Sequence, residues 1–347
     1  MAYKKDYLDY NSILNQLNKD GLQRVYLLWG EEEYLKEQFK EKLLQHCFSN
    51  NADDFNYKKI RVGGEINIDE VENAIDAMPF MAERTLVEVQ DADINKMTES
   101  DTERFVSMVS NIPDYCTVLF VQNSLFTPDG RLKSVKAIKK NGVEIHFTTP
   151  EPNHLNRWIS ERFKAYGKTI GSSATEHLVF ISGNLMNRLL PEIDKIASYA
   201  KNKEVTKEDI DAVANHIPEA DVFMITDSIS KRQTDRAAAI LSELLDDKNN
   251  EPIALLALIG NQIRRLYATK LYLEQRLDNQ FLEEMLNSNK SYYLDKQKEA
   301  ARGFSLDYLR NAVDLCCEAD YKMKSSGNDS KEILKELVMR ICAGAKV

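Results

Sequence analysis

The 347-residue sequence predicts an α/β domain built around a mostly parallel sheet, followed by two helical parts. Three observations lead to this prediction. Short β-branched and aromatic runs alternate with helical patterns over residues 22–148, which is typical of strands joined by crossover helices. Two prolines, Pro150 and Pro152, then interrupt the pattern. Nearly everything after them has the spacing of helices.

The first domain, taken as residues 1–148, is expected to contain alternating strands and helices. Runs of β-branched and aromatic residues predict strands at Val25–Trp29, Lys59–Val62, Thr85–Val89, Thr117–Val121 and Val143–Phe147. Helical spacing predicts helices at Tyr34–Cys47, Ile68–Ala77, Glu99–Ser110 and Leu132–Lys140. Gly142 is expected to end the last of these helices.

Residues 149–217 are expected to form a small helical domain, and residues 218–347 a helical bundle. The pattern over residues 153–216 indicates about four helical segments. The last of them follows Thr206, which can cap it, and has Asp209 in its first turn, where negative charge is favoured. Longer helices are predicted at Asp221–Ser230, Thr234–Leu245, Pro252–Glu274, Ser291–Arg302, Ser305–Lys324 and Ser330–Cys342.

Composition excludes several classes of protein. A net charge of -9 argues against strong nucleic-acid binding by the chain alone. No apolar run approaches the roughly 20 residues that span a bilayer. Residues 1–6 lack the apolar core of a signal peptide, so we expect a cytoplasmic protein with no membrane partner. The five cysteines have neither zinc-site spacing nor disulfide density, and we expect reduced, buried thiols.

The first predicted strand runs into Gly30 and then a helix, which is where a phosphate-binding loop would lie. Such a loop needs glycines, a Lys and a Ser or Thr for magnesium. Glu31, Glu32 and Glu33 follow Gly30 instead, and carboxylates at a helix start repel phosphates. Taken alone, they are better interpreted as favourable first-turn residues. Both interpretations exclude nucleotide at this position.

Catalytic and metal-binding patterns are also missing from the sequence. Asp91 and Asp93 are the nearest candidates for a metal pair, but without a partner Lys or His they are better interpreted as turn residues. The five histidines are scattered, with no metal-ligand spacing. We therefore expect no catalytic residue, no metal site, no nucleotide site and no cofactor, so that the isolated chain is not an enzyme.

The segment Ile75–Arg84 ends a helix with three large apolar residues around Pro79. Pro79 stops the helix and favours an extended Met78. We therefore expect Met78, Phe80 and Met81 to be presented together, and these three residues are called the knuckle below. Flexible methionines beside a phenylalanine are typical of an adaptable protein-binding surface. From composition alone, an equally good interpretation is that they fill the local core.

The whole chain resembles the delta subunits of the bacterial DNA polymerase III clamp loader. The resemblance is carried by Val25–Leu35, by Ala77–Arg84 and, near the end, by Glu318–Lys324. It implies that residues 1–148 form an AAA+-like (RecA-like) domain without its phosphate loop. It further implies a helical lid-type domain over residues 149–217 and a helical collar domain over residues 218–347 that joins the other loader subunits.

The resemblance also implies a function and a set of partners. A delta subunit binds the ring-shaped sliding clamp (beta) and holds one interface open for primed DNA, while sister subunits hydrolyse ATP. Its expected partners are the clamp, the delta prime and gamma/tau subunits, and primed DNA within the assembly. The holoenzyme to which the subunit would belong is a DNA-directed DNA polymerase. The matching clamp-binding residues are Met78, Phe80 and Met81.

Basic residues offer a weaker indication of function. Lys324, in the last matching segment, is expected to contact the collar or DNA. The other basic groups are better interpreted as solvated faces or subunit contacts: Lys133, Lys136, Lys139, Lys140, Lys231, Arg232, Arg236, Arg264 and Arg265. Two alternatives to a clamp-opening subunit remain, namely a degenerate AAA+ ATPase and a DNA-binding scaffold.

Overall fold

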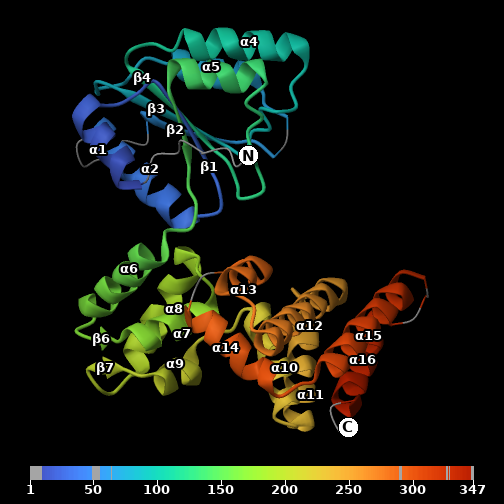
Figure 1. The fold of residues 1–347 in the computed structure, drawn as a ribbon. Coiled ribbons are helices and arrows are strands. Elements are labelled where there is room, and N and C mark those ends of the chain that lie inside the picture. The colour runs from blue at the N-terminus through green and yellow to red at the C-terminus, as the bar shows by residue number, and fades with distance from the viewer. Residues whose placement is uncertain are drawn as a thin grey trace. The chain divides into compact units, whose positions relative to one another are not determined.

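The computed structural model describes residues 10–48, 55–63, 65–288, 291–325, 327 and 329–344 (Figure 1). Contacts divide the described residues into two compact units. The first comprises those up to Pro152 together with Leu185–Asn187, and the second comprises Asn153–Asn184 and everything from Arg188 onward. The expected division into three domains, at residues 148 and 217, stays a prediction.

The first unit is built on a five-stranded sheet in which every neighbouring pair of strands is parallel. Its strands are β1 (Val25–Trp29), β2 (Tyr57–Arg61), β3 (Thr85–Gln90), β4 (Cys116–Val121) and β5 (Val143–His146). Their order in the sheet is β2-β3-β4-β1-β5. The predicted architecture is confirmed: an α/β unit with a parallel sheet, followed by helical regions.

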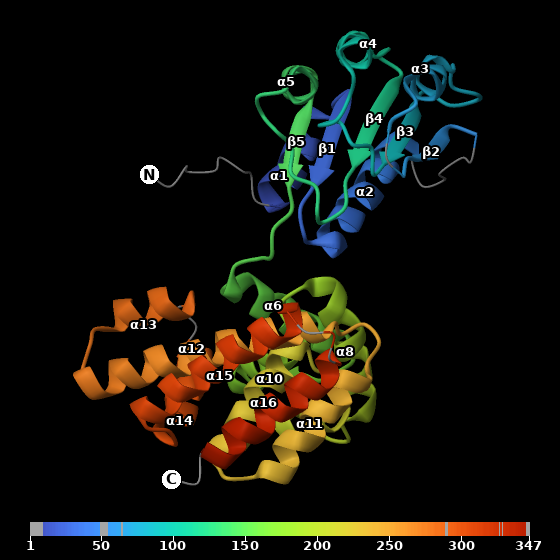
Figure 2. The ribbon, with the colours of Figure 1, turned by 90° about the vertical axis from the view of Figure 1, so that its right-hand side faces the viewer.

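Helices cover both faces of this sheet, as buried parallel sheets require. In the first unit the helices are α1 (Tyr10–Asp20), α2 (Glu33–Phe48), α3 (Ile68–Asp76), α4 (Glu99–Ser110) and α5 (Lys133–Asn141). Figure 2 shows α3, α4 and α5 on one face and α1 and α2 on the other. Alternate residues of each strand face each layer: Leu27 and Phe120 belong to the core under α3–α5. Tyr26 instead packs its ring 5.7 Å from that of Phe39 in α2.

Two glycines permit close approaches that hold β1 in place. A Cβ on Gly142, just after α5, would lie 2.0 Å from the carbonyl oxygen of Val25. Gly30 has a left-handed φ of +115°, and a Cβ there would lie 2.3 Å from the carbonyl oxygen of Phe147. Both positions therefore require glycine, because any side chain would displace backbone.

The second unit is mainly helical. Its first part contains α6 (Pro152–Ala165), α7 (Ser172–Ser182), α8 (Met186–Tyr199), α9 (Lys207–Val213) and a short parallel pair, β6 (Thr169–Ile170) with β7 (Glu204–Val205). The rest contains α10 (Pro218–Ser230), α11 (Thr234–Asp246), α12 (Pro252–Gln275), α13 (Asn279–Leu286), α14 (Ser291–Arg302), α15 (Leu306–Ser325) and α16 (Ser330–Gly344). Thr206 caps α9 in a capping box with Asp209, as expected from the sequence.

The sequence-based predictions missed four elements of the fold. Among the side chains described in helix α1, Ile13 and Leu17 are the buried large apolar ones, and two such positions make a short helical pattern. Helix α13 spans 8 residues, too few for a clear helical pattern. Strands β6 and β7 have 2 residues each and exist only through their pairing with one another. Strand β2 begins at Tyr57 rather than Lys59, because pairing with β3 includes polar Lys58.

All five cysteines are free thiols. The expectation that they are all buried is wrong for Cys317, which is exposed, and for Cys47, which is half-buried. Cys316 and Cys317 are neighbours on α15, so when Cys316 packs into the helical core the next residue points elsewhere. No helix in the described part of the chain combines the length and the apolar character needed to cross a membrane.

Two leucines near the end of β4 provide a test of this fold. Leu119 is fully buried and Leu125 is 92% exposed. We predict that Leu119→Ala lowers the free energy of unfolding of the first unit by about 2–5 kcal/mol, whereas Leu125→Ala changes it by less than about 0.5 kcal/mol. Urea unfolding followed by Trp29 fluorescence, in a Trp158→Phe background, isolates the first unit. Equal losses for both variants would contradict the described register.

Candidate functional site

The knuckle lies between the end of α3 and the start of β3, at the amino edge of the sheet (Figure 2). Helix α3 ends at Asp76, because Ala77 is extended, with φ -65° and ψ 118°, and Pro79 follows. The side chains of Met78, Phe80 and Met81 are 82%, 60% and 90% exposed. The alternative that they fill the local core is therefore wrong.

Neighbouring loops at the same edge hold the knuckle backbone. The carboxamide of Asn56 accepts from the Phe80 N–H at 2.7 Å and donates to the Phe80 carbonyl at 2.8 Å. The Tyr115 hydroxyl donates to the Asp76 carbonyl at 3.2 Å. Met81 has a φ of 49°, which is uncommon for a residue other than glycine and turns the chain toward β3. The exposed side chains thus stand on a backbone with specific partners.

An aromatic ring beside the knuckle was missed by the sequence analysis. Phe55 is 73% exposed, and its ring lies 5.9 Å from that of Phe80 at an angle of 53°. Phe55 and Asn56 lie 24 or more positions before Phe80 in the chain, and no local pattern connects the two segments. Only the pairing of β2 with β3 brings them together.

The start of α2 occupies the position where a phosphate-binding loop would lie. Helix α2 begins at Glu33, three residues after Gly30, so little chain remains to wrap phosphates. Each of the three carboxylates has a protein partner. Glu31 accepts from the Thr149 hydroxyl at 2.7 Å, Glu33 pairs with Lys36 at 2.7 Å, and Glu32 accepts from a backbone N–H at 3.1 Å.

Lys36 was overlooked in the sequence, although its spacing is informative. A phosphate loop has its Lys six positions after its first glycine, and Lys36 stands six positions after Gly30. Leu35 and Glu37 replace the second glycine and the Ser or Thr. In the structure the Lys36 side chain is 1% exposed, and its ammonium donates to the Gln122 carbonyl at 2.7 Å as well as pairing with Glu33. This lysine is therefore an internal support of α2.

Glu32 is a fully buried carboxylate. Burial raises its pKa to about 6, and this effect outweighs the hydrogen bond from the backbone N–H of Met186, which favours the charged form. Met186 belongs to the short segment that packs with the first unit. This carboxylate lies at the start of α2, where the positive end of the helix favours negative charge.

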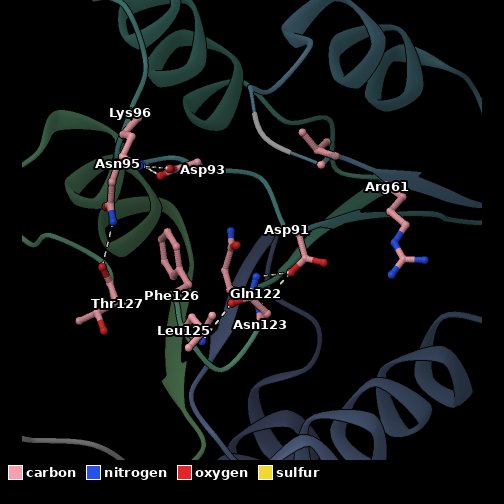
Figure 3. Close-up of a pocket in the computed structure, with 12 residues that line it drawn as sticks. Arg61, Asp91, Asp93, Asn95, Lys96, Gln122, Asn123, Leu125, Phe126 and Thr127 are labelled. Atoms are coloured by element: carbon pink, nitrogen blue, oxygen red, sulfur yellow. Dashed lines mark hydrogen bonds and ion pairs between the residues drawn. The ribbon is translucent and has the colours of Figure 1, made fainter. Parts of the chain in front are cut away.

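A polar pocket of about 740 Å³ lies at the opposite edge of the sheet, where β2, β3 and β4 end (Figure 3). Asp91 accepts from the backbone and side-chain nitrogens of Asn123, each at 3.0 Å. Asp93 accepts from the Asn95 N–H at 3.2 Å. Both aspartates are turn residues, as interpreted from the sequence. Among the described residues no group of three or more His, Cys, Asp or Glu side chains could hold a metal ion.

Lys324 lies far along the chain in α15 and is not part of the first unit. Its ammonium is exposed and pairs with Asp320 one turn earlier, at 2.8 Å. In the same region Lys322 and Arg340 pair with Glu318 and Glu336 across α15 and α16. A contact of Lys324 with a collar or with DNA stays a prediction.

This chain is similar to known DNA polymerase III delta subunits. A family model described as "DNA polymerase III, delta subunit" matches residues 26–148, and one described as "DNA polymerase III delta subunit, C-terminal domain" matches residues 219–341. DNA polymerase III subunit delta of Bacillus subtilis (strain 168) is 27% identical over 337 residues, covering 94% of this chain and 95% of that protein. The probable DNA polymerase III subunit delta of Aquifex aeolicus (strain VF5) is 20% identical, with coverages of 92% and 91%.

Among solved structures, the DNA clamp loader delta protein of Bacillus subtilis matches with a TM-score of 0.51. It is 24% identical, and the match covers 96% of this chain and 99% of that chain. This likeness supports the fold described above.

The buried carboxylate of Glu32 predicts a pH dependence of stability. In the unfolded chain it loses its proton near pH 4.5, and in the folded chain near pH 6. Because the unfolded state releases the proton first as the pH rises, this group lowers the free energy of unfolding between pH 4.5 and 6, by on the order of 2 kcal/mol. Glu32→Gln should therefore be more stable than the parent at about pH 7.5 and similar to it at about pH 4.5.

Urea unfolding of the Trp158→Phe chain at the two pH values measures this difference. Glu31→Gln is the matched control, since it removes a neighbouring carboxylate that is exposed and not buried. A Glu32→Gln effect of equal size at both pH values would contradict the raised pKa.

Proposed function

The chain belongs to the DNA polymerase III delta subunit family, and we propose that it binds the ring-shaped sliding clamp and holds one of its interfaces open for primed DNA. In this proposal it is a cytoplasmic, non-catalytic subunit of the clamp loader. The observation that carries the proposal is the knuckle, in which three large apolar side chains are 60–90% exposed on a supported backbone.

The knuckle has the size needed for a binding hot spot. Fully burying a Met or Phe side chain contributes about 1.5–3 kcal/mol, so two or three such residues dominate a typical protein interface. Met78, Phe80 and Met81 are flexible or aromatic, which suits an apolar pocket on the clamp. Hydrogen bonds from Asn56 hold the backbone of the knuckle, so little ordering is required when it binds.

Opening a ring requires more than binding it. A ligand shifts an equilibrium only if it binds one state more tightly than the other. The proposed subunit must therefore bind the distorted clamp interface better than the closed one. An apolar knuckle that inserts beside the interface binds the open clamp more tightly than the closed one if the clamp pocket, or the surface around it, is more accessible in the open ring.

We propose that this chain hydrolyses no ATP itself. The support is the start of α2, where Glu31, Glu32 and Glu33 stand in place of the loop and Lys36 is buried in an ion pair. Sister subunits of the delta prime and gamma/tau types would supply hydrolysis. In the assembly, residues 149–217 would serve as a lid-type domain and residues 218–347 as the collar that joins these subunits. With a net charge of -9, contact with primed DNA would be shared with them.

A double substitution tests the role of the knuckle. We predict that Met78→Ser with Phe80→Ser lowers affinity for the sliding clamp of the same organism at least about a hundredfold, because two buried anchors are lost. Surface plasmon resonance measures the affinity, and a fluorophore pair across the clamp interface reports opening. Leu125→Ser, at the opposite sheet edge and also exposed, is the control and should change neither signal. Unchanged affinity in the double variant would refute the assignment of the knuckle as the clamp contact.

Nucleotide binding separates this proposal from a degenerate ATPase. We predict that isothermal calorimetry with ATP and Mg²⁺ gives no saturable heat with the full chain, since carboxylates fill the phosphate position. The same preparation should bind the clamp, which shows that it is correctly folded. Saturable ATP binding by a clamp-binding preparation would favour the ATPase alternative.

A further inference from the structure

Asn56 connects three segments at the amino edge of the sheet. Its side chain is 1% exposed, and it forms hydrogen bonds with both the N–H and the carbonyl of Phe80. Its own carbonyl accepts from the Leu86 N–H at 2.9 Å, one residue into β3. Asn56 is therefore fixed to the sheet on one side and to the knuckle on the other.

This arrangement gives Phe80 the two hydrogen bonds that a neighbouring strand would give it. The knuckle lies outside the regular sheet, in a connection between α3 and β3. A carboxamide that both donates and accepts restricts the position of the Phe80 backbone, and with it the direction of the side chain. Restricting a binding segment in advance reduces the entropy lost on association.

Phe55 precedes Asn56 and stands beside the knuckle. Its ring lies 5.9 Å from that of Phe80 at 53°, and it is 73% exposed. In the core, Phe105 and Phe120 form a pair of almost the same geometry, 5.4 Å and 52°, with both rings fully buried. The Phe55–Phe80 pair thus has the ring geometry of a core pair, but both of its rings are exposed. A binding partner would cover them.

We propose that Phe55 and Asn56 form the second half of the clamp-binding surface. Phe55 contacts the apolar pocket of the sliding clamp together with Phe80, and Asn56 is a positioning residue that acts through the Phe80 backbone. This inference rests on the proposed function. It extends the contact surface from one connection to two neighbouring ones, joined by the β2–β3 pairing.

The contact role is tested by Phe55→Ala in the full chain, with affinity for the sliding clamp measured by surface plasmon resonance. Loss of one aromatic anchor should weaken binding by about tenfold. Tyr321→Ala is the matched control, because Tyr321 is aromatic and 72% exposed but lies on α15 in the second unit. Binding by Phe55→Ala within twofold of the parent would overturn the proposal.

The positioning role is tested by a double-mutant cycle between Asn56 and Phe80. Asn56→Ala should weaken clamp binding by about tenfold in the parent chain but less than about twofold in the Phe80→Ala chain, because the residue that it positions is then gone. If Asn56 only supported the fold, its loss would have the same effect in both backgrounds, which would overturn the proposal. Trp29 fluorescence on urea unfolding identifies variants that remain folded.

These outcomes are distinguishable from failure of the proposed function, in which the parent chain itself does not bind the sliding clamp. If Met78→Ser with Phe80→Ser leaves clamp binding unchanged, the knuckle itself is not the contact. If that double variant loses binding while Phe55→Ala retains it, or while the cycle shows no coupling, the knuckle binds the clamp without the Phe55–Asn56 segment.

Discussion

Parallel pairing of all five strands is the constraint on which the first unit depends. Parallel strands start at one edge of a sheet and end at the other, so every connection crosses a face as a helix. The segments before β2, β3 and β4 consequently meet at the amino edge, where Asn56 reaches Phe80 and Tyr115 reaches Asp76. The segments that follow the strands meet at the carboxyl edge, and the polar pocket lies there. The knuckle and the start of α2 are thus separated by the length of the strands.

The start of α2 occupies the position of a phosphate-binding loop, and the protein's own contacts fill it. Gly30 approaches Phe147 closely, and Lys36 stands at the spacing of a phosphate-loop lysine. The helix begins earlier, however, and its own carboxylates take the place of an anionic ligand. Lys36 pairs with Glu33 and with a backbone carbonyl inside the protein. These contacts hold β1 and α2 together without any bound ligand.

The exposed apolar side chains of the knuckle have a cost for a free protein, since clustered apolar surface promotes unwanted association. Two features limit that cost. Pro79 and the left-handed Met81 keep the connection from forming a strand that other chains could extend. Hydrogen bonds from Asn56 satisfy the backbone of Phe80, so only side chains are available for contact. Recognition by a shaped apolar pocket is therefore favoured over backbone pairing.

The sequence by itself determined elements whose signal is local. Strand β1 and helix α4 occur at the predicted residues, because a continuous apolar run and helical spacing after the Thr98 cap need no distant partner. It also identified the knuckle residues from composition and from Pro79, but left their exposure at even odds. Only the tertiary structure decided that they are exposed, that Asn56 holds Phe80, that Phe55 lies beside it and that Lys36 is internal. Each of these depends on segments brought together by strand pairing or helix packing, and side-chain periodicity along the chain carries no information about such contacts.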